Sequence, residues 1–231
     1  MQAFRIVPLT PFNSPLMTLK QRYNAIFAYF REHQPIVDTE LQFGSVFQLL
    51  VAVVLSAQCT DKRVNLVTPA LFQAYPDAQS MAQADESEVY EYIKSVSYPN
   101  AKAKHLVALS QILATQYSGQ VPSDMDALLQ LPGVGRKTAN VMQAVAFRMN
   151  AMPVDTHVYR VSHRLGLVPK SCNTPYKVEQ HLLKHTPEGS AADAHHWLLL
   201  HGRYICKSQR PLCDKCPFTT FCPKNLEGSK L

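Results

Sequence analysis

A lysine follows two closely spaced glycines in the segment Leu131–Thr138, which reads LPGVGRKT. Helical patterns flank this segment, and glycines at alternate positions permit positive backbone angles and close approach of another backbone. The following helix would begin with free amide groups and a positive dipole end, which suits a phosphate oxygen. We therefore take Gly133, Gly135, Arg136 and Thr138 as candidate phosphate contacts. A plain helix–helix turn is the alternative, and the spacing is not that of a nucleotide-binding P-loop.

Lys137 adds a possible nucleophile to this turn. A lysine in the first turn of a helix lies in the unfavourable positive field of the dipole, and partial desolvation would lower its pKa further from about 10.4. The neutral amine can then form a Schiff base with a carbonyl carbon. A solvent-facing lysine that only binds phosphate is the alternative.

Asp155 is the candidate carboxylate, 18 residues beyond Lys137 in the segment PVDTH. It is well placed as the N-cap of a helix carrying Val158 and Val161. A carboxylate there can also stabilise positive charge on a sugar as its base leaves, or help to deprotonate a nucleophile. The two roles are compatible. We interpret His157 as a structural hydrogen-bonding residue.

Four of the six cysteines fall within Cys206–Cys222, with six, two and five residues between Cys206, Cys213, Cys216 and Cys222. This clustering favours a metal site in a reducing compartment over a disulfide framework. Zinc sites usually contain two close cysteine pairs, and here there is only one. The spacing therefore favours a four-iron cluster, with zinc as the alternative.

Composition limits the class of protein. Of 231 residues, 46% are hydrophobic and 17% charged, which indicates a folded chain. Residues 136–231 carry 14 Lys and Arg against 6 Asp and Glu, so this part is suited to a polyanion such as nucleic acid. We expect no membrane span and no secretory peptide, because the longest apolar run, Val46–Ala57, is too short for a bilayer and the first 17 residues lack an apolar core.

The apolar periodicity predicts an all-α protein of about ten short helices. Thr18 can cap a helix over Leu19–Glu32. The other helical faces and the turn signals are given by the following residues: Phe43, Val46, Phe47, Leu50, Val51, Val54 and Leu55 in one helix, Leu106, Leu109 and Leu113 in another, Val154, Val158, Val161 and Leu165 in a third, Lys137–Phe147 after the glycine turn, and turns at Tyr75–Asp77, Tyr98–Asn100 and Ser118–Gly119.

Together these features resemble the endonuclease III family of the helix-hairpin-helix DNA glycosylase superfamily. The resemblance runs from about Met17 to Cys222. The matching segments are LSAQCTD from Leu55, LPGVGRKTAN from Leu131, VDTHVYRV from Val154, HHWL from His195, and HGRY from His201 leading into Cys206.

The resemblance implies two all-α lobes that flank a DNA-binding cleft. One is a six-helix barrel with the helix-hairpin-helix, over residues 39–150. The other combines residues 18–38 with 151–231 and carries a [4Fe–4S] cluster held by the four cysteines, as a structural or redox-modulating group. Residues 1–17 are expected to form a loose extension. The implied protein is a cytoplasmic, nucleoid-associated monomer that binds damaged double-stranded DNA.

The resemblance also implies roles for individual residues. Lys137 matches the catalytic lysine and Asp155 the catalytic aspartate of an enzyme that excises oxidised pyrimidines and cleaves the strand by β-elimination. The damaged nucleotide would be flipped out of the duplex, because its anomeric carbon is unreachable in the stack. Independently of the resemblance, the positive charges of Lys207 and Arg210, in the first loop of the cysteine cluster, would suit a phosphate backbone.

Two further residues match positions that meet the duplex. Gln58 corresponds to a residue that fills the gap left by the flipped nucleotide, unless it is a buried residue at a helix end. The segment Ser97-Tyr98-Pro99-Asn100 departs from the family form of Gly, an apolar residue, Tyr and Asn. Tyr98 would then act as a wedge that stacks on a base.

Two other functions remain open from the sequence. A mismatch adenine glycosylase of the same superfamily would carry an acid near Gln58 and lack the hairpin lysine, whereas residues 53–58 contain no acid and Lys137 is present. A non-catalytic DNA-binding module with a zinc-bound tail would be colourless and would not be trapped on DNA by borohydride.

Overall fold

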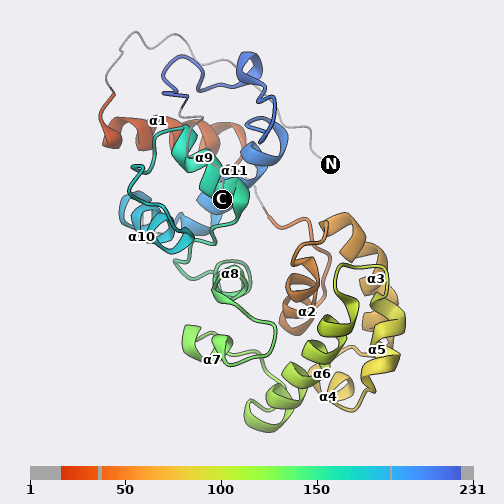
Figure 1. Cartoon of the computed structure of the whole chain (residues 1–231). Helices are drawn as coiled ribbons and strands as arrows, with labels where there is room; N and C mark the ends of the chain where they lie inside the picture. The colour runs from red at the N-terminus through yellow and green to blue at the C-terminus, as the bar shows by residue number, and fades with distance from the viewer. Residues whose placement is uncertain (1–16, 36–37, 188, 225–231) are drawn as a thin grey trace. The chain divides into compact units, whose positions relative to one another are not determined.

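The computed structural model describes residues 17–35, 38–187 and 189–224, and only Met17 of the expected loose extension lies within this part. The described residues form helices and loops without a β-strand, which confirms the all-α prediction (Figure 1). None of these helices is both long and apolar enough to cross a membrane. The helices are α1 (Leu19–His33), α2 (Val46–Ser56), α3 (Asp61–Ala74), α4 (Ala78–Ala82), α5 (Glu86–Ile93), α6 (Pro99–Gln116), α7 (Met125–Leu129), α8 (Arg136–Val141), a π-helical turn (Met142–Ala146), α9 (Thr156–Arg164), α10 (Pro175–His185), α11 (Ala191–Tyr204) and a 3-10 turn (Cys213–Lys215).

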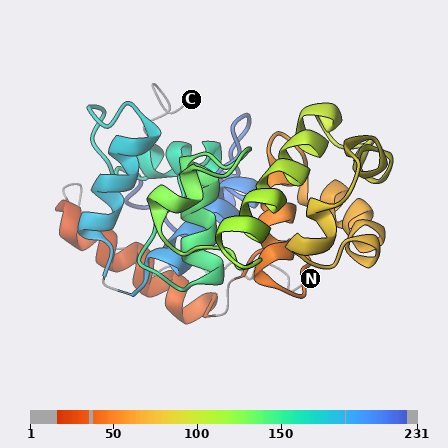
Figure 2. The ribbon, with the colours of Figure 1, turned by 90° about the horizontal axis from the view of Figure 1, so that it is seen from below.

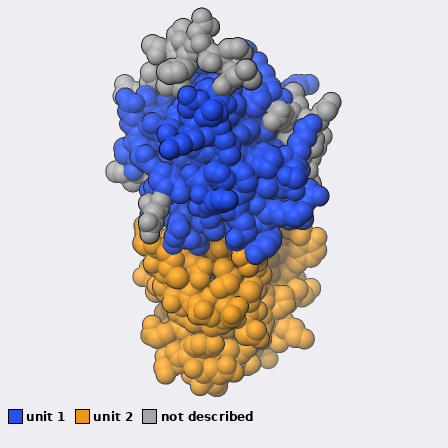
Figure 3. All heavy atoms as spheres, turned by 90° about the vertical axis from the view of Figure 1, so that its left-hand side faces the viewer, with its two compact units in different colours: residues 1–38, 150–231 blue, residues 39–149 orange. Residues whose placement is uncertain are grey.

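The chain divides into two compact units (Figure 3). Each unit has its own hydrophobic core. Unit 1 is made of residues 1–38 and 150–231, and unit 2 of residues 39–149. The glycine turn and Lys137 belong to unit 2, whereas Asp155 and the four cysteines belong to unit 1.

Helix α2 is the central helix of unit 2. Every residue from Leu49 to Leu55 is buried, as expected for a helix that is apolar on all sides. Ser45 caps the helix by accepting a hydrogen bond from the backbone N–H of Gln48. The inclusion of Phe43 in this helical face was wrong, because Phe43 precedes the cap and is 41% exposed.

Two other predictions in unit 2 need correction. The predicted turn at Tyr98–Asn100 is a turn only at Tyr98, because Pro99 is the first residue of α6. Proline suits this position, where its missing N–H would have had no helical partner. The single helix predicted over Lys137–Phe147 instead begins at Arg136 as α8 and continues as a π-helical turn over Met142–Ala146.

Unit 1 is held together by contact between its first helix and the C-terminal part of the chain. Thr18 caps α1 in a capping box with Gln21, so the predicted start of this helix is confirmed. The ring of Phe30 stacks on that of Trp197 in α11, with centroids 5.7 Å apart. The indole N–H of Trp197 donates to the carbonyl oxygen of Gln34 at 2.9 Å. Figure 2 shows α1, in red, beside the blue C-terminal segments.

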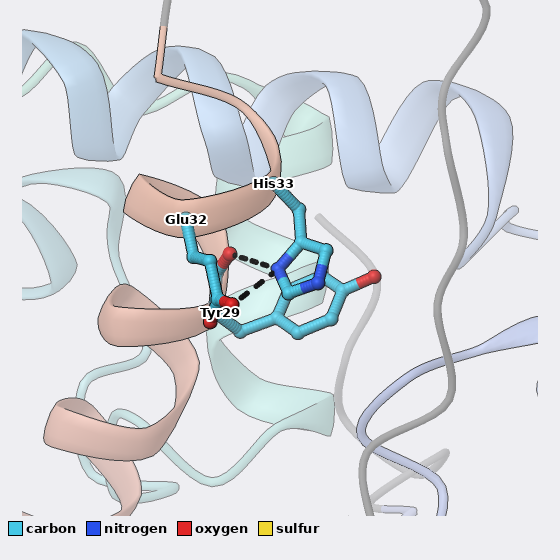
Figure 4. Close-up of polar contacts among 3 residues, drawn as sticks. All are labelled: Tyr29, Glu32 and His33. Carbon is cyan, nitrogen blue, oxygen red and sulfur yellow. Dashed lines mark hydrogen bonds and ion pairs between the residues drawn. The ribbon is translucent and has the colours of Figure 1, made fainter.

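The last turn of α1 is closed by an aromatic and polar contact (Figure 4). His33 donates from Nδ1 to the carbonyl oxygen of Tyr29 at 2.9 Å, and its ring stacks on the Tyr29 ring at 4.1 Å. The Glu32 carboxylate lies 4.0 Å from the same nitrogen. The His33 ring thus adds a side-chain donor to the Tyr29 carbonyl in the last turn of the helix.

Candidate active site

Two buried apolar residues anchor the glycine turn in unit 2. Leu131 and Val134 are 2% and 7% exposed. The backbone N–H of Val134 donates to the carbonyl oxygen of Leu131 at 3.0 Å, which closes the turn. Gly133, which lies between them, and Gly135, which follows, are both exposed.

The two glycines differ in backbone conformation and in the space around them. Gly133 has a φ of 79°, and a Cβ there would lie 3.0 Å from the imidazole of His105. Gly135 has a φ of −94°, and a Cβ there would meet no atom within 4 Å. The positive angle that glycine permits is therefore found at Gly133 and not at Gly135, while Gly135 leaves open space at the start of α8.

Helix α8 begins without a side-chain cap, because its N-cap is Gly135. Arg136 and Lys137 are exposed in its first turn, and Thr138 is 9% exposed. Thr138 therefore faces the protein, and only its backbone amide remains for the predicted phosphate contact. Lys137 is exposed on unit 2, so packing within this unit does not provide the partial desolvation expected of its amine.

Gln58 and Tyr98 lie on neighbouring loops of unit 2. Both are exposed, so the alternative of a buried glutamine at a helix end was wrong for Gln58. Both have a left-handed backbone, with φ of 53° and 56°. The Ser97 hydroxyl donates to the carbonyl oxygen of Gln58 at 2.7 Å, which joins the two loops.

Asp155 caps α9 in unit 1, as predicted. Its carboxylate accepts a hydrogen bond from the backbone N–H of Val158 at 2.8 Å, and the side chain is half-buried. The segment before it is held by buried His195, whose Nδ1 lies 2.8 Å from the carbonyl oxygen of Pro153. Asp155 is thus fixed from both sides.

Arg160 is a buried residue that the sequence reasoning missed. Its guanidinium donates to the carbonyl oxygens of Gly202 at 2.9 Å and Cys206 at 3.2 Å, and it lies 3.2 Å from Nδ1 of His157. Burial lowers the pKa of His157, with Asp155 opposing the shift. His157 therefore has the structural role expected of it.

The four cysteines of the cluster line one pocket in unit 1, together with Leu165, His201, Ile205 and Leu212. The backbone N–H of Lys224 donates to Sγ of Cys222 at 3.4 Å. Among the described residues, no group of three or more His, Cys, Asp or Glu side chains is arranged to hold a metal ion. The pocket thus gathers the thiols around one space without forming the compact geometry of a single-ion site.

Arg164 ties the loop after Cys206 to α9. Its guanidinium donates to the carbonyl oxygens of Lys207 at 2.7 Å and Ser208 at 3.0 Å, and lies 3.7 Å from Sγ of Cys206. The side chains of Lys207 and Arg210 are exposed on this loop. Arg160 and Arg164 stand four residues apart on α9, a spacing that places both on one face and was the available signal for their shared role.

A family model described as "HhH-GPD superfamily base excision DNA repair protein" matches residues 51–188. The chain is 48% identical over 202 residues to endonuclease III of Rickettsia felis, which covers 87% of this chain and 94% of that protein. It is 42% identical over 197 residues to endonuclease III of Escherichia coli K12, with 85% and 92% covered.

The chain belongs to the endonuclease III family.

The fold gives the same assignment. The structure is similar to one described as "Structure of a Trapped Endonuclease III-DNA Covalent Intermediate: Estranged-Adenine Complex", with a TM-score of 0.84 and 40% sequence identity over 90% of this chain and 97% of that one. As an endonuclease III family member, the chain is a base excision repair DNA glycosylase and AP lyase, which confirms the predicted activity.

Proposed function

We propose that this endonuclease III family member excises oxidised pyrimidines from double-stranded DNA, with Lys137 as the nucleophile. The observation that carries the proposal is the position of Lys137: exposed, in the first turn of a helix, two residues after a glycine whose Cβ position is open space. An amine there is accessible to a nucleotide that has left the base stack.

In the proposed reaction, Nζ of Lys137 attacks C1′ of the flipped nucleotide. The glycosidic bond breaks, and its electron pair leaves with the damaged base, which takes up a proton. The sugar ring opens to an imine with Lys137. Loss of a proton from C2′ then breaks the bond from C3′ to its oxygen, so that the strand is cut on the 3′ side.

Asp155 would serve this reaction as a fixed carboxylate. Negative charge near the sugar favours the positive charge that develops as the base leaves, and the carboxylate can also accept a proton from the attacking amine. The cap to Val158 and the contact of His195 with Pro153 hold it in place. Such rigidity supports electrostatic stabilisation, because the group does not have to reorganise during the reaction.

DNA would be bound without sequence readout by the glycine turn, with Gly133, Gly135, Arg136 and the backbone of Thr138 at the phosphates, and by exposed Lys207 and Arg210. The resemblance further supports a monomer that works on nucleoid DNA. Gln58 and Tyr98 would enter the gap that the flipped nucleotide leaves in the duplex. Because cations on the protein release counterions from DNA, affinity should fall steeply with salt.

Cys206, Cys213, Cys216 and Cys222 would hold a [4Fe–4S] cluster. Four thiols around one largely apolar pocket are the donor set of such a cluster, and the N–H groups that face Cys206 and Cys222 match the hydrogen bonds that cluster sulfurs accept. When bound, the cluster supplies a crosslink between these loops and a one-electron redox centre. Zinc at the same cysteines is the alternative.

A borohydride-trapping panel tests the proposal. Purified protein would be incubated with duplexes that contain thymine glycol, oxidised cytosine, an adenine mismatch or an abasic site. We expect covalent complexes with the oxidised pyrimidines and the abasic site, and none with the adenine mismatch. Failure to trap any lesion would overturn the proposal, and selective action on the mismatch would favour the adenine glycosylase. Visible absorbance of the same preparation separates an iron–sulfur cluster from zinc.

A further inference from the structure

Gln58 and Tyr98 both hold an uncommon backbone conformation at an exposed position. A left-handed φ is rare for residues other than glycine and persists where the surrounding structure enforces it. Tyr98 is 65% exposed, so its ring is not held by burial. The contacts that fix these two residues must therefore be made by their neighbours.

Two side chains make those contacts. The hydroxyl of half-buried Ser97 donates to the carbonyl oxygen of Gln58 at 2.7 Å. The ammonium of Lys102, which is 5% exposed, donates to the carbonyl oxygens of Leu55 at 2.8 Å and Ala57 at 2.7 Å. Lys102 thus holds the residues just before Gln58, and Ser97 holds Gln58 itself.

Lys102 is bonded to both loops at once. Its backbone N–H donates to the carbonyl oxygen of Tyr98 at 3.1 Å, as the first hydrogen bond of α6. Its ammonium meets the C-terminus of α2, where unpaired carbonyls and the negative end of the dipole favour a cation. Burial lowers the pKa of Lys102, but the two carbonyl contacts remain available to it in either protonation state. One residue therefore links the end of α2 to the start of α6.

We propose that Ser97 and Lys102 are positioning residues that hold Gln58 and Tyr98 at a fixed separation, so that the two side chains enter the duplex as one insert. This inference rests on the proposed function. The amide of Gln58 can donate to and accept from the base opposite the lesion, while the ring of Tyr98 can stack. Discrimination between opposite bases needs an amide at a fixed position, so Ser97 sets how strongly excision depends on the opposite base.

Ser97→Ala tests this inference, since it removes one partly exposed hydroxyl. The readout is the single-turnover excision rate of thymine glycol placed opposite each of the four bases. The spread is the ratio of the excision rate on the fastest duplex to that on the slowest. Loss of one hydrogen bond is expected to reduce this ratio about threefold to tenfold. Ser97→Thr keeps the hydroxyl and should restore most of the spread. Ser80→Ala is the matched control, because Ser80 bonds only locally to Asp77, and it should keep the wild-type spread.

A second readout follows the insert itself. With 2-aminopurine opposite the lesion, protein binding should raise the fluorescence as that base unstacks. The rise should be smaller with Ser97→Ala and unchanged with Ser80→Ala. Lys102→Met should reduce the fluorescence rise further. If Lys102→Met does not fold, the fluorescence rise of Ser97→Ala alone decides the test.

The outcomes separate the inference from the proposed function. If wild-type protein excises thymine glycol and Ser97→Ala keeps both the spread and the fluorescence rise, the inference is wrong and the proposed function stands. If wild-type protein excises nothing and is not trapped on any lesion, both are overturned.

Discussion

The carboxylate of Asp155 accepts a hydrogen bond of 2.8 Å from the backbone N–H of Val158. The group proposed to act on the sugar is therefore also the N-cap of α9. A variant that lost activity merely because α9 frayed would mimic a catalytic defect. Any test of Asp155 has to separate these two contributions.

Replacement of Asp155 by Asn and by Ala separates them. Asn is as good an N-cap as Asp, so Asp155→Asn should change the free energy of unfolding little, whereas Asp155→Ala should destabilise by about 0.5–2 kcal/mol. Both variants should excise thymine glycol about 10²- to 10⁴-fold more slowly, because both lose the carboxylate. Urea denaturation and single-turnover kinetics measure the two effects. Full activity of Asp155→Asn would leave Asp155 with the capping role alone.

Lys137→Gln should abolish the borohydride-trapped complex. The side chain is exposed and lies at the surface of unit 2, so its replacement should not affect the core or the stability. Binding to duplex DNA, measured by fluorescence anisotropy, should fall only slightly, because the other phosphate contacts remain. A trapped species that persisted in Lys137→Gln would identify a different nucleophile, and equal loss of binding and trapping would indicate a phosphate-binding lysine.

Gly135→Ser should weaken DNA binding without weakening the fold. The extended backbone at Gly135 suits serine, which is a better N-cap than glycine, so the free energy of unfolding should stay level or rise by a few tenths of a kcal/mol. The new side chain would fill the open space before α8, where a phosphate is expected. Affinity for duplex DNA should fall about fivefold or more, the equivalent of about 1 kcal/mol. Unchanged affinity would mean that this space is not used by DNA.

Gly133→Ala is the complementary variant for that experiment. A left-handed φ of 79° and the approach of His105 should make it less stable by about 1–2 kcal/mol. Gly133→Ala should therefore lose stability, whereas Gly135→Ser should lose affinity for DNA.

Arg164→Met should loosen the loop after Cys206. It leaves the carbonyl oxygens of Lys207 and Ser208 without their charged donor. We expect faster loss of visible absorbance when the loaded protein is incubated with an iron chelator. Lys170→Met, which removes an exposed cation from the same unit, is the control and should behave as wild type. Equal bleaching of the three proteins would show that Arg164 does not secure the loop.

Local signals in the sequence were enough to place several elements. The cap at Thr18 and the apolar face of Val46–Leu55 correctly predicted α1 and α2, because capping and burial are properties of neighbouring residues. Proline marks both turns and first helical positions, so Pro99 could not be assigned to α6 from its type alone. The π-helical turn leaves the apolar spacing nearly unchanged, and for this reason the pattern after Gly135 predicted a single helix.

The site was predictable to the extent that residue type reveals its role. Lys137 and Asp155 stood out by type and spacing, but the exposure of Lys137 depends on packing that the sequence does not show. Gly133 and Gly135 are of the same residue type but differ in backbone conformation, so residue type alone could not distinguish them. Arg160 and Arg164 contributed to the count of positive charge expected at a DNA surface. Instead they are buried and donate to backbone carbonyls of unit 1. Those carbonyls belong to a segment more than 40 residues later in the chain, so the local pattern could not reveal the contact.

The stacking of Phe30 on Trp197 sets an order for events during synthesis on the ribosome. Unit 2 is one uninterrupted stretch, so all of its residues emerge before unit 1 is complete. Helix α1, by contrast, is made first and has to wait for Trp197, with its aromatic face exposed until then. Nascent chains that stop before α11 should therefore be the ones that need a chaperone.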